Sequence, residues 1–583
     1  MILQALCDYY HRKAALGEMP PYGREWKPIP YLIIIDSDGN FIRLEPTYEG
    51  EGKDKRAKKY LVARSRGRTG QKSWTISNLL WDHYGYVFGF PKKMDFNNAK
   101  LVDTGKKQCG VFQQEIKRLM QLNPNNDELL AVNKFYEHLQ ANIEKLKADG
   151  NFDEAFKKDG TNFAFKLVSG IEPVGTAPHF NYGTPTDEAP QALCLVTGTR
   201  QPIAITNSSI SLRNGNPTGC VLVGFQRNSG YDSYHKEQGM NAPISQQANY
   251  AYTTALSTLL APQSKNKFFF NKDTLVFWAD RDNPMEDVFA SFFAVPPKDD
   301  PNRGVKAITA LMKAPLTGSI GSTSSKARFY LLQLSPNSAR IAVKLWEESS
   351  VDALAENMRR YFDDLDIVHG AAEPPYMPLN SLLRSIALQG KEENLPPQLF
   401  QEMMRAIIHN LPLPELLQSQ TLGRIKADRS VTRNRAALLK AYLNRKPNNN
   451  EIKITMSLNL QNNNQAYLCG RLFAVYEKMQ QEALGSVNTS VRDRFYDSFS
   501  STPNVALHRL DTLSVHHLQK LSQGRQIYFE KLKGEIIDKL NGEGLPHHFS
   551  LDDQSRFAIG YYQQRQQFFV KKQDAGENQS ENK

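Results

Sequence analysis

The sequence predicts an α+β N-terminal domain followed by an all-α helical bundle in the C-terminal part. Up to about residue 370, short β-rich runs alternate with stretches of helical periodicity, without the regular strand–helix count of a parallel α/β fold. The proline-rich segment from His369 to Pro378 then breaks the chain, and only helical periodicity follows it. At 583 residues the chain is also too long for one hydrophobic core, so several units are expected.

The N-terminal domain, 1–370, begins with a helix from Ile2 to about Leu16, which ends at Gly17 and the Pro20-Pro21 pair. A β-hairpin follows, because the turn residues Asp36 to Asn40 separate two β-rich runs. The later elements of this domain are helical stretches at 112–122 and 127–147, short β runs between 193 and 225, a helix at 245–260, a strand at 274–278, a hairpin at 329–334 and 341–346, and a helix at 351–365.

The C-terminal region is predicted to have three parts. Residues 371–455 form a helical connecting region, which includes a polar break from Pro447 to Asn450. Residues 571–583 are polar and charged without hydrophobic spacing, so we expect them to be disordered. Between these parts, residues 456–570 form a helical bundle, whose first long helix has an apolar face made of Leu468, Leu472, Val475, Tyr476 and Met479.

Composition favours a soluble cytoplasmic protein with a polyanionic partner. The formal net charge is +11, and neutralisation of phosphates by Lys and Arg drives binding to nucleic acids, although a basic enzyme could carry the same charge. The five cysteines are far apart and form no C-x-x-C pair, so we expect buried thiols. The longest aliphatic run, Leu32 to Ile35, is far below the ~20 residues of a membrane helix, and the N-terminus is unlike a signal peptide.

A basic segment between residues 53 and 72 is the first candidate for nucleic-acid contact. Gly67 and Gly70 allow a ligand to approach the backbone, and Trp74 and Trp81 offer flat faces nearby. The alternative is a solvated flexible loop, which is the usual meaning of an isolated charge run. The candidate DNA-binding residues of this segment are Lys53, Lys55, Arg56, Lys58, Lys59, Arg64, Arg66, Arg68 and Lys72.

Two further basic groups lie on predicted C-terminal helices. In the first group, cations alternate with apolar residues such as Ile425 and Leu439, which fits either a nucleic-acid contact or an ordinary amphipathic helix packed in a bundle. The second group either pairs with Glu477 or Asp493 inside the bundle or lines a groove for a strand. The candidates are Arg424, Lys426, Arg429, Arg433, Arg435 and Lys440 in the first group and Arg471, Arg492 and Arg494 in the second.

A loop rich in amides precedes the predicted helix at 245–260. Ser245 can cap that helix, and capping alone would explain the loop. Asn and Gln side chains beside DNA can also read base edges or help to wedge a duplex open. The candidates are Asn241, Gln246 and Gln247 in the loop, with Gln226 and Asn228 upstream.

Motifs of common enzymes are missing from the sequence. It contains no G-x-x-x-x-G-K-[ST], H-E-x-x-H or G-x-S-x-G pattern. The adjacent pairs His516-His517 and His547-His548 would point about 100° apart on a helix and so make poor joint metal ligands. We therefore expect no catalytic residue, metal or cofactor. The alternative is a metal-dependent nuclease whose acidic site is assembled from distant residues, with Asp493, Asp497, Asp552 and Asp553 as candidates.

Eight segments, taken together and in order, carry a family resemblance. The N-terminal half contains "MILQALCDYYHRKAALGEMPPYG", "RTGQKSWTISNLLWDHYGYVFG" and "GFQRNSGYDSYHKEQGMNAPISQQANYAYTTALSTLLA". The C-terminal half contains "IKADRSVTRNRAALLKAYLNR", "GRLFAVYEKMQ", "VRDRFYDSFSSTPNVAL", "HHLQKL" and "SLDDQSRFAIGYYQQRQQF". Over essentially its whole length the chain resembles the large subunit of the type I-C CRISPR surveillance complex (Cascade). One departure is Gly224-Phe225-Gln226, where the family usually has Ser-Phe-Asn, so a role carried by that Asn does not transfer directly.

The resemblance implies a non-catalytic large subunit of an RNA-guided antiviral DNA surveillance complex. The N-terminal domain of such a subunit contacts the protospacer-adjacent motif (PAM) and starts duplex opening, which makes Thr69, Lys72, Asn78 and the 241–247 loop candidates for PAM reading. Its helical C-terminal domain lies along the target heteroduplex or the displaced strand and stabilises the R-loop. The implied partners are guide RNA, target double-stranded DNA, crRNA-backbone subunits, a handle-binding subunit, small subunits and a recruited helicase–nuclease.

Met456 is a candidate internal start. It stands after the break at 447–450 and ahead of three or four predicted amphipathic helices, which are enough to close a small bundle. The alternative is an ordinary core or loop methionine. The resembling family makes its small subunit from an internal start within the gene of the large subunit. A product that begins at Met456 would carry Arg471, Arg492, Arg494 and Arg509.

Overall fold

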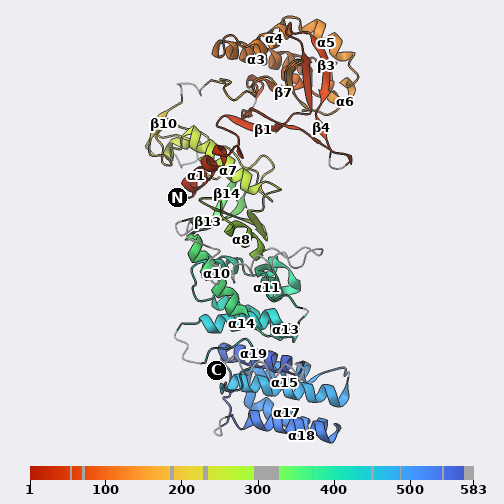
Figure 1. The fold of residues 1–583 in the computed structure, drawn as a ribbon, viewed down its shortest axis with the longest axis vertical. Coiled ribbons are helices and arrows are strands. Elements are labelled where there is room, and N and C mark those ends of the chain that lie inside the picture. The colour runs from red at the N-terminus through yellow and green to blue at the C-terminus, as the bar shows by residue number, and fades with distance from the viewer. Residues whose placement is uncertain are drawn as a thin grey trace. The chain divides into compact units, whose positions relative to one another are not determined.

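The computed structural model describes residues 1–52, 55–68, 73–183, 189–227, 234–293, 327–371, 373–447, 452–485, 487–540 and 544–569 (Figure 1). Its contacts divide the chain into two compact units. The first unit consists of Met1–Ser208 and Gly224–Leu256, and the second of Ser209–Val223 and Ser257–Lys583. The predicted fold class is confirmed, because sheets and helices mix in the N-terminal part whereas the C-terminal part is helical.

A four-stranded mixed sheet in the order β3-β2-β8-β7 lies in the core of the first unit. β2 (Tyr31–Ile35) pairs antiparallel with β3 (Phe41–Pro46) and parallel with β8 (Asn162–Leu167), which in turn pairs antiparallel with β7 (Trp81–His83). All five residues of β2 are buried, as expected for an apolar run in a central strand. The predicted hairpin is confirmed, and the Asp36 carboxylate stabilises its turn by accepting the backbone N–H groups of Asp38 and Asn40.

Helices pack against this sheet (Figure 1). They include α2 (Tyr84–Val87), α3 (Ala99–Leu122), α4 (Asp127–Glu137), α5 (Leu139–Lys147) and α6 (Phe152–Lys157). The buried amide of Asn142 joins α5 to the hairpin: its oxygen accepts the Phe41 N–H at 2.9 Å and its nitrogen donates to the Gly39 carbonyl at 3.0 Å. The predicted helical stretches at 112–122 and 127–147 are confirmed by α3 and by α4 with α5.

The first unit also contains short antiparallel ribbons, the helix α1 (Ile2–Ala15) and most of the helix α7 (Gln246–Leu260). The ribbons pair β1 (Arg24–Pro28) with β6 (Lys59–Ala63), β4 (Tyr48–Glu49) with β5 (Arg56–Ala57), and β9 (Gln191–Leu193) with β10 (Arg200–Pro202). The helix α1 confirms the predicted opening helix. Edge-to-face contact between the rings of Tyr10 and Tyr250, 5.6 Å apart at their centroids, joins α1 to α7.

The second unit contains an antiparallel four-stranded sheet with helices packed against it. Its strands, in spatial order, are β11 (Lys267–Phe270), β12 (Asp273–Ala279), β13 (Arg328–Asn337) and β14 (Arg340–Ser350), so the predicted hairpin at 329–346 and the strand at 274–278 are confirmed. The helices that pack against the sheet are α8 (Met285–Phe293), α10 (Val351–Leu365) and α12 (Pro397–Ile408), and α11 (Leu379–Ile386) packs on α8 and α14 (Arg433–Arg445). Buried aromatic rings join sheet to helix, as where Phe289 of α8 packs on Phe277 and Phe329.

The C-terminal helices form successive packed layers (Figure 1). They are α13 (Glu415–Asp428), α14 (Arg433–Arg445), α15 (Gln465–Leu484), α16 (Val491–Ser501), α17 (Pro503–Leu518), α18 (Gln523–Ile537) and α19 (Leu551–Gln567). α15 is enclosed on all sides, since every residue from Ala466 to Tyr476 is buried. The predicted apolar face of this helix is therefore only part of its buried surface.

One continuous hydrophobic core runs through the second unit, from Phe270 to Tyr562. The phenol of Tyr562 in α19 donates a hydrogen bond to the Val368 carbonyl at 2.9 Å, which ties the end of the chain to the segment after α10. The predicted limits at 370 and 455 fall inside this unit, and as functional boundaries they stay predictions. The predicted tail, 571–583, lies outside the described residues.

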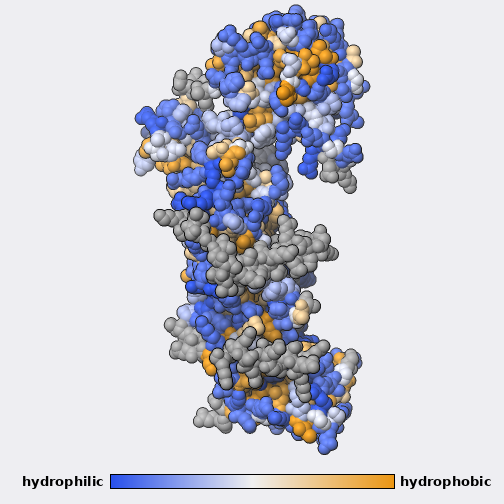
Figure 2. Space-filling model, in the orientation of Figure 1, coloured by the Kyte–Doolittle hydropathy of each residue, from blue (hydrophilic) through white to orange (hydrophobic). Residues whose placement is uncertain are grey.

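Surface and thiol properties follow the composition. Figure 2 shows one face of the molecule, on which hydrophilic residues predominate and smaller apolar patches lie between them. All five cysteines are buried and unpaired, which confirms the predicted buried thiols. No helix in the described ranges combines the length and the apolar character that crossing a membrane requires.

Candidate nucleic-acid interface

The β4–β5 hairpin and the start of β6 present exposed cations. Lys55, Arg56, Lys58 and Lys59 are all exposed, and none of them forms an ion pair with a carboxylate in the described part of the chain. The ammonium groups of Lys55 and Lys58 lie 4.9 and 5.2 Å from the ring centroids of Tyr48 and Tyr60. These contacts orient the side chains without neutralising them, so the charges remain available to phosphates.

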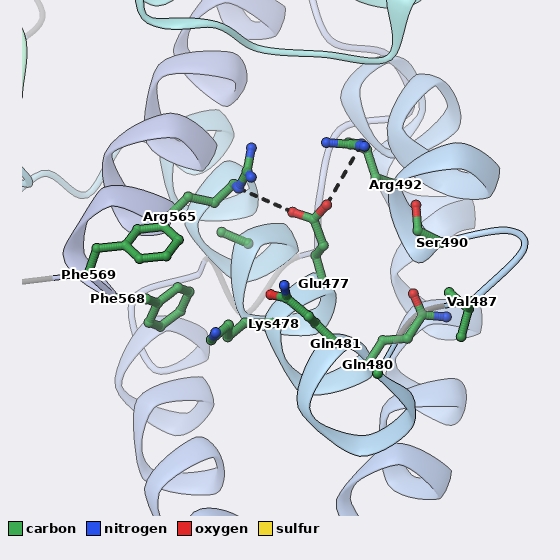
Figure 3. Close-up of a pocket in the computed structure, with 12 residues that line it drawn as sticks. Glu477, Lys478, Gln480, Gln481, Val487, Ser490, Arg492, Arg565, Phe568 and Phe569 are labelled. Atoms are coloured by element: carbon green, nitrogen blue, oxygen red, sulfur yellow. Dashed lines mark ion pairs between the residues drawn. The ribbon is translucent and has the colours of Figure 1, made fainter. Parts of the chain in front are cut away.

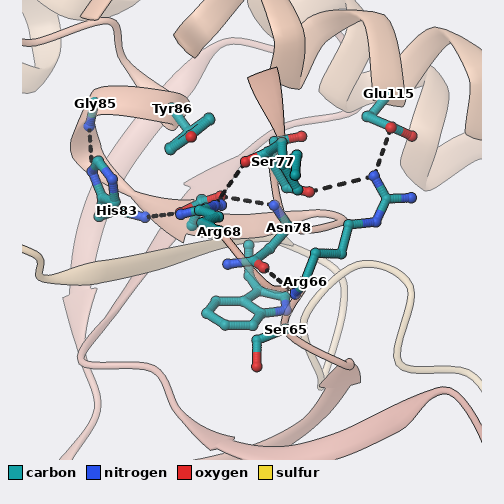
Figure 4. A network of polar contacts seen from close by, with 12 residues as sticks. Ser65, Arg66, Arg68, Ser77, Asn78, His83, Gly85, Tyr86 and Glu115 are labelled. Carbon is teal, nitrogen blue, oxygen red and sulfur yellow. Dashed lines mark hydrogen bonds and ion pairs between the residues drawn. The ribbon is translucent and has the colours of Figure 1, made fainter. Parts of the chain in front are cut away.

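Arg66 and Arg68, which follow in the same basic segment, have internal partners instead (Figure 4). Arg66 donates to the Glu115 carboxylate at 2.6 Å, and Arg68 forms a two-pronged ion pair with Asp82, a carboxylate that is 1% exposed. Burial alone would raise the pKa of Glu115, but hydrogen bonds from Arg66 and Arg118 outweigh it and lower that pKa. Both guanidinium charges are thus largely matched within the fold.

Asn78 and Trp81 also belong to this internal network. The side-chain amide oxygen of Asn78 accepts the Arg66 backbone N–H at 3.0 Å, and the backbone N–H of Asn78 donates to the Asp82 carboxylate at 2.8 Å. Trp81 is buried, with its indole N–H donating to the Ala63 carbonyl at 2.8 Å, so it offers no flat face to a ligand. The network fixes the loop between β6 and β7, and base contact by Asn78 stays a prediction. Three other predicted residues of this segment, Lys53, Thr69 and Lys72, lie outside the described residues.

Arg64 differs from its two neighbours because no described carboxylate pairs with it. Its guanidinium group lies 4.6 Å from the ring centroid of Tyr250, and its Nη2 atom is 3.5 Å from the Thr253 hydroxyl. The backbone is held in place where the Arg64 N–H donates to the Gly23 carbonyl at 2.8 Å. The side chain is half-buried on an aromatic face, and no carboxylate in the described ranges matches its charge.

A pocket of about 550 Å³ brings Arg64 together with Gln246, two predicted DNA-binding residues that are far apart in the sequence. Gln246 begins α7, where the Ser245 hydroxyl accepts the Ala248 N–H at 3.1 Å and so confirms the predicted N-cap. The pocket combines a guanidinium, amides, hydroxyls and phenol rings, which are the groups that contact base edges, base faces and phosphates. The other lining residues are Tyr22, Gly23, Ala189, Pro190, Ile203, Ala204, Ile205, Thr206, Ser208, Asn249 and Tyr250.

Asn249 and Tyr250 are pocket residues that the sequence reasoning missed. They follow Gln246 by three and four positions, which is the spacing that places side chains on one face of a helix. That spacing could have identified them once Gln246 was a candidate. The Asn249 amide binds Ser208 through both of its polar atoms, at 3.1 and 3.2 Å, and so positions the loop that closes one side of the pocket.

The other amide candidates have different surroundings. The Asn241 side chain donates to the carbonyls of Lys236 and Gln238 at 3.2 and 3.1 Å, which stabilises its own turn. Gln247 and Gln226 are exposed, and contact with DNA by either one stays a prediction. Asn228 lies outside the described residues.

Four C-terminal candidates are buried and hold the bundle together. The Arg433 guanidinium donates to the carbonyls of Pro374 and Pro375, and Arg435 binds Asp428 and the Ser385 carbonyl. Lys440 donates to the Asp364 carbonyl at 2.9 Å, and Arg471 to the Gln564 amide at 3.1 Å. Burial lowers the pKa of both Lys440 and Arg471. These four cations therefore pack within the helical bundle, which was the alternative to nucleic-acid contact, because they donate to carbonyl or side-chain oxygens inside the fold.

The remaining C-terminal cations lie nearer the surface. Arg424 pairs with Asp428 along its helix, and Lys426 lies 3.4 Å from Asp497. Arg429 and Arg494 are exposed and form no ion pair within 4.0 Å of a described carboxylate. Arg492 approaches Glu477 at 3.8 Å, one of the two pairings that the sequence suggested.

The four acids of the predicted alternative, a nuclease site, have separate structural partners. Asp493 and Asp553 each complete a capping box, with Ser490 at the start of α16 and with Ser550 at the start of α19. Asp552 binds Lys446 at 2.5 Å and Asp497 faces Lys426. In the described ranges, no group of three or more His, Cys, Asp and Glu side chains is arranged to hold a metal ion.

Comparison with known protein families identifies a match over most of the chain. The family model described as CRISPR-associated protein (Cas_Csd1) matches residues 6–569, which is nearly the whole chain. No curated protein matches the sequence significantly.

Proposed function

The chain belongs to the Cas_Csd1 family of CRISPR-associated proteins, and we propose that it is the non-catalytic large subunit of a type I-C, RNA-guided antiviral DNA surveillance complex. In this role the guide RNA reads the target sequence by base pairing, whereas the protein reads a short motif and the shape of the duplex. The subunit would recognise the PAM, help to open the duplex, stabilise the R-loop and support recruitment of a helicase–nuclease. Its other partners would be crRNA-backbone subunits, a handle-binding subunit and small subunits.

The observation that carries the proposal is the pairing of two kinds of surface in the first unit. The exposed cations of the β4–β5 hairpin and the start of β6, which pair with no described carboxylate, suit the phosphate backbone, because such contacts are independent of sequence. The pocket with Arg64 and Gln246 offers directional donors and acceptors, which suit base edges. We therefore expect phosphate-backbone contacts and base-specific contacts to come from different residues, as in other proteins that recognise a DNA sequence.

We also propose that a small subunit is made from an internal start at Met456, and the bundle from α15 to α19 supports this. Met456 is 49% exposed and precedes α15, and its carbonyl oxygen accepts the Val368 N–H at 2.9 Å. A product that begins there would contain the whole α15–α19 pair. It would lack α13 and α14, which pack on α19 in the full-length chain, so the uncovered face of α19 would need a partner.

Purification of the chain from its host, with a C-terminal tag, tests the proposal. We expect it to co-purify with short RNA of uniform length and with several other proteins. A chain that purifies alone, free of RNA, would contradict its place in an RNA-guided complex. A metal-dependent cleavage assay on the same preparation tests the non-catalytic part, for which we expect no cleavage of DNA or RNA by the isolated chain.

A further inference from the structure

A second pocket lies in the C-terminal bundle, where the ends of α15 and α19 meet the start of α16 (Figure 3). Its volume is about 340 Å³, which lies within the ~300–1,000 Å³ of typical small-ligand sites. α15 contributes Glu477, Lys478 and Gln481, α16 contributes Arg492, α19 contributes Arg565, and the turn after α19 contributes Phe569. Three helices therefore surround a cavity that is distant in sequence from the pocket of Arg64.

Positive charge exceeds negative charge in this pocket. Figure 3 shows the guanidinium groups of Arg492 and Arg565 on opposite sides of Glu477, with ion-pair distances of 3.8 and 3.5 Å through their Nε atoms. The Glu477 carboxylate also accepts a hydrogen bond of 2.6 Å from the Tyr561 phenol. Lys478 on the same wall pairs with Glu482 at 3.6 Å, so the excess of positive charge comes from two arginines that share one carboxylate. This excess favours an anionic ligand.

The two arginines retain capacity to bind such a ligand. A guanidinium group has five N–H donors, and neither arginine forms a hydrogen bond to Glu477 at close range. The Nε atom of Arg492 is buried and has no hydrogen-bond acceptor in the described part of the chain. A buried donor without an acceptor is unfavourable, and an oxygen of a phosphate group entering the pocket would supply one.

An aromatic wall stands beside the cations. Phe568 and Phe569 line the pocket at the end of α19, and the Phe569 side chain is 71% exposed. The Lys478 ammonium lies 5.9 Å from the Phe569 ring centroid. Aromatic faces beside a positively charged groove are the arrangement that binds unpaired nucleotides, because every base has a flat face that can stack. An acidic peptide would use the cations and leave this wall without a function.

We propose that this pocket binds one unstacked nucleotide of a single-stranded nucleic acid, with its base on Phe569 and its phosphate between Arg492 and Arg565. The inference rests on the proposed function only for the source of the strand, since an R-loop contains unpaired DNA. The pocket chemistry can be tested without the complex, so its failure and the failure of the proposed function are distinguishable.

The test measures binding of a fluorescently labelled oligothymidine of about 12 nucleotides to the purified full-length chain by anisotropy. Phe569→Ala removes the stacking face at an exposed position, and we expect binding to weaken by roughly 5-fold or more without a change in salt dependence. Arg565→Ala should weaken binding and reduce the slope against log salt by up to ~0.7, the value of one phosphate contact on a single strand. An oligomer with the same phosphates but no bases should bind the parent and Phe569→Ala equally.

Two exposed residues of α18 provide matched controls. Tyr528→Ala removes a half-exposed ring, and Lys531→Ala removes an exposed cation, both outside the pocket. Loss of affinity in these controls equal to that in the pocket variants would overturn the proposal, because binding would then be diffuse. Unchanged binding by Phe569→Ala would also overturn it. Displacement of the oligomer by thymidine monophosphate at equal concentration would show that a free nucleotide is the ligand, and would overturn the single-strand assignment.

Discussion

Gly470 of α15 and Gly560 of α19 bring the backbones of these two helices into direct contact. A Cβ atom on Gly470 would lie 2.0 Å from the Phe557 carbonyl oxygen, and one on Gly560 would lie 2.3 Å from the Tyr467 carbonyl oxygen. Both neighbours are backbone atoms, so a side chain at either position would push the helices apart. The pair is central to the region from 456 to 569, which we propose can also exist as a separate product.

Gly470→Ala should therefore destabilise the bundle. Alanine gains up to ~1 kcal/mol of helix propensity over glycine, but overpacking of a closed contact costs about 1–3 kcal/mol or more. We expect faster hydrogen exchange throughout α15 and α19, by a factor that corresponds to the net loss. Gly534→Ala is the matched control, because nothing lies within 4 Å of its Cβ position in α18, and it should leave exchange unchanged or slower. Equal exchange in the two variants would contradict the close contact.

The stability of the first unit should decrease in mild acid because of His83. Its Nδ1 atom accepts the Gly85 N–H at 3.1 Å and so caps α2 in the unprotonated form. Burial lowers the pKa of His83, although the Asp82 carboxylate acts in the opposite direction. Below about pH 6.5, the pKa of His83 in the unfolded chain, the unfolded state therefore binds more protons than the folded state. The contribution of His83 to stability is complete above that pH. It is lost as the pH falls from there toward the lower pKa of the folded state.

His83→Asn tests this pH dependence, since Asn caps a helix without titrating in this range. We expect the midpoint of thermal unfolding to fall between pH 7.5 and pH 5.5 by more in the parent than in His83→Asn. The comparison between the two chains removes the contribution of other titrating groups. If the midpoint falls equally in the parent and in His83→Asn, His83 is not the cause of the pH dependence.

The exposed cations of the β4–β5 hairpin and the start of β6 should supply affinity without specificity. Replacement of Lys55, Arg56, Lys58 and Lys59 by Ala should weaken binding of the assembled complex to any duplex, and should reduce the slope against log salt by up to ~0.9 per lost phosphate contact. Electrophoretic shift at several salt concentrations measures both quantities. Replacement of Lys145 and Lys147, exposed near the end of α5, serves as the control and should leave the slope unchanged. An unchanged slope in the hairpin variant would place the phosphate contacts elsewhere.

Met456→Leu should abolish a short C-terminal product and leave the full-length chain intact. The exposed side chain tolerates this substitution, because Leu and Met have similar volumes. A C-terminal tag reveals both products on one immunoblot. Met479→Leu, inside α15, is the control and should retain the short product. If the short product persists in Met456→Leu, or if the parent protein does not form it, Met456 is not a start.

Local patterns in the sequence predicted most of the fold. The hairpin at 31–44 combines an apolar run with Asp and Asn in its turn, and the N-cap at Ser245 precedes a regular helix, so both depend on residues close in the chain. The enclosure of α15 was not predictable in this way. Arg471 resembles a surface residue in a helical pattern, and its burial depends on Gln564 of α19, which no local signal connects to it.

The candidate site could be predicted only in part for the same reason. The run from Lys53 to Lys72 reads as one basic segment, yet Arg66 and Arg68 pair with Glu115 and Asp82 whereas Arg64 does not pair with any described carboxylate. Charge partners of this kind are set by the packing of α3 and β7 on the loop. The meeting of Arg64 with Gln246 likewise depends on the tertiary fold, although both residues were candidates individually.

The most direct test of the account is the preference of the assembled complex for PAM-bearing over PAM-less duplex DNA when Arg64 or Gln246 is replaced by Ala. A base contact contributes about 1–3 kcal/mol of discrimination, so we expect the ratio of the two affinities to fall roughly 5-fold or more in at least one variant. Arg43→Ala, which removes an exposed cation of β3, is the control and should leave the ratio unchanged. Equal loss of affinity for both DNAs, with the ratio preserved in both Arg64→Ala and Gln246→Ala, would contradict PAM reading at this pocket.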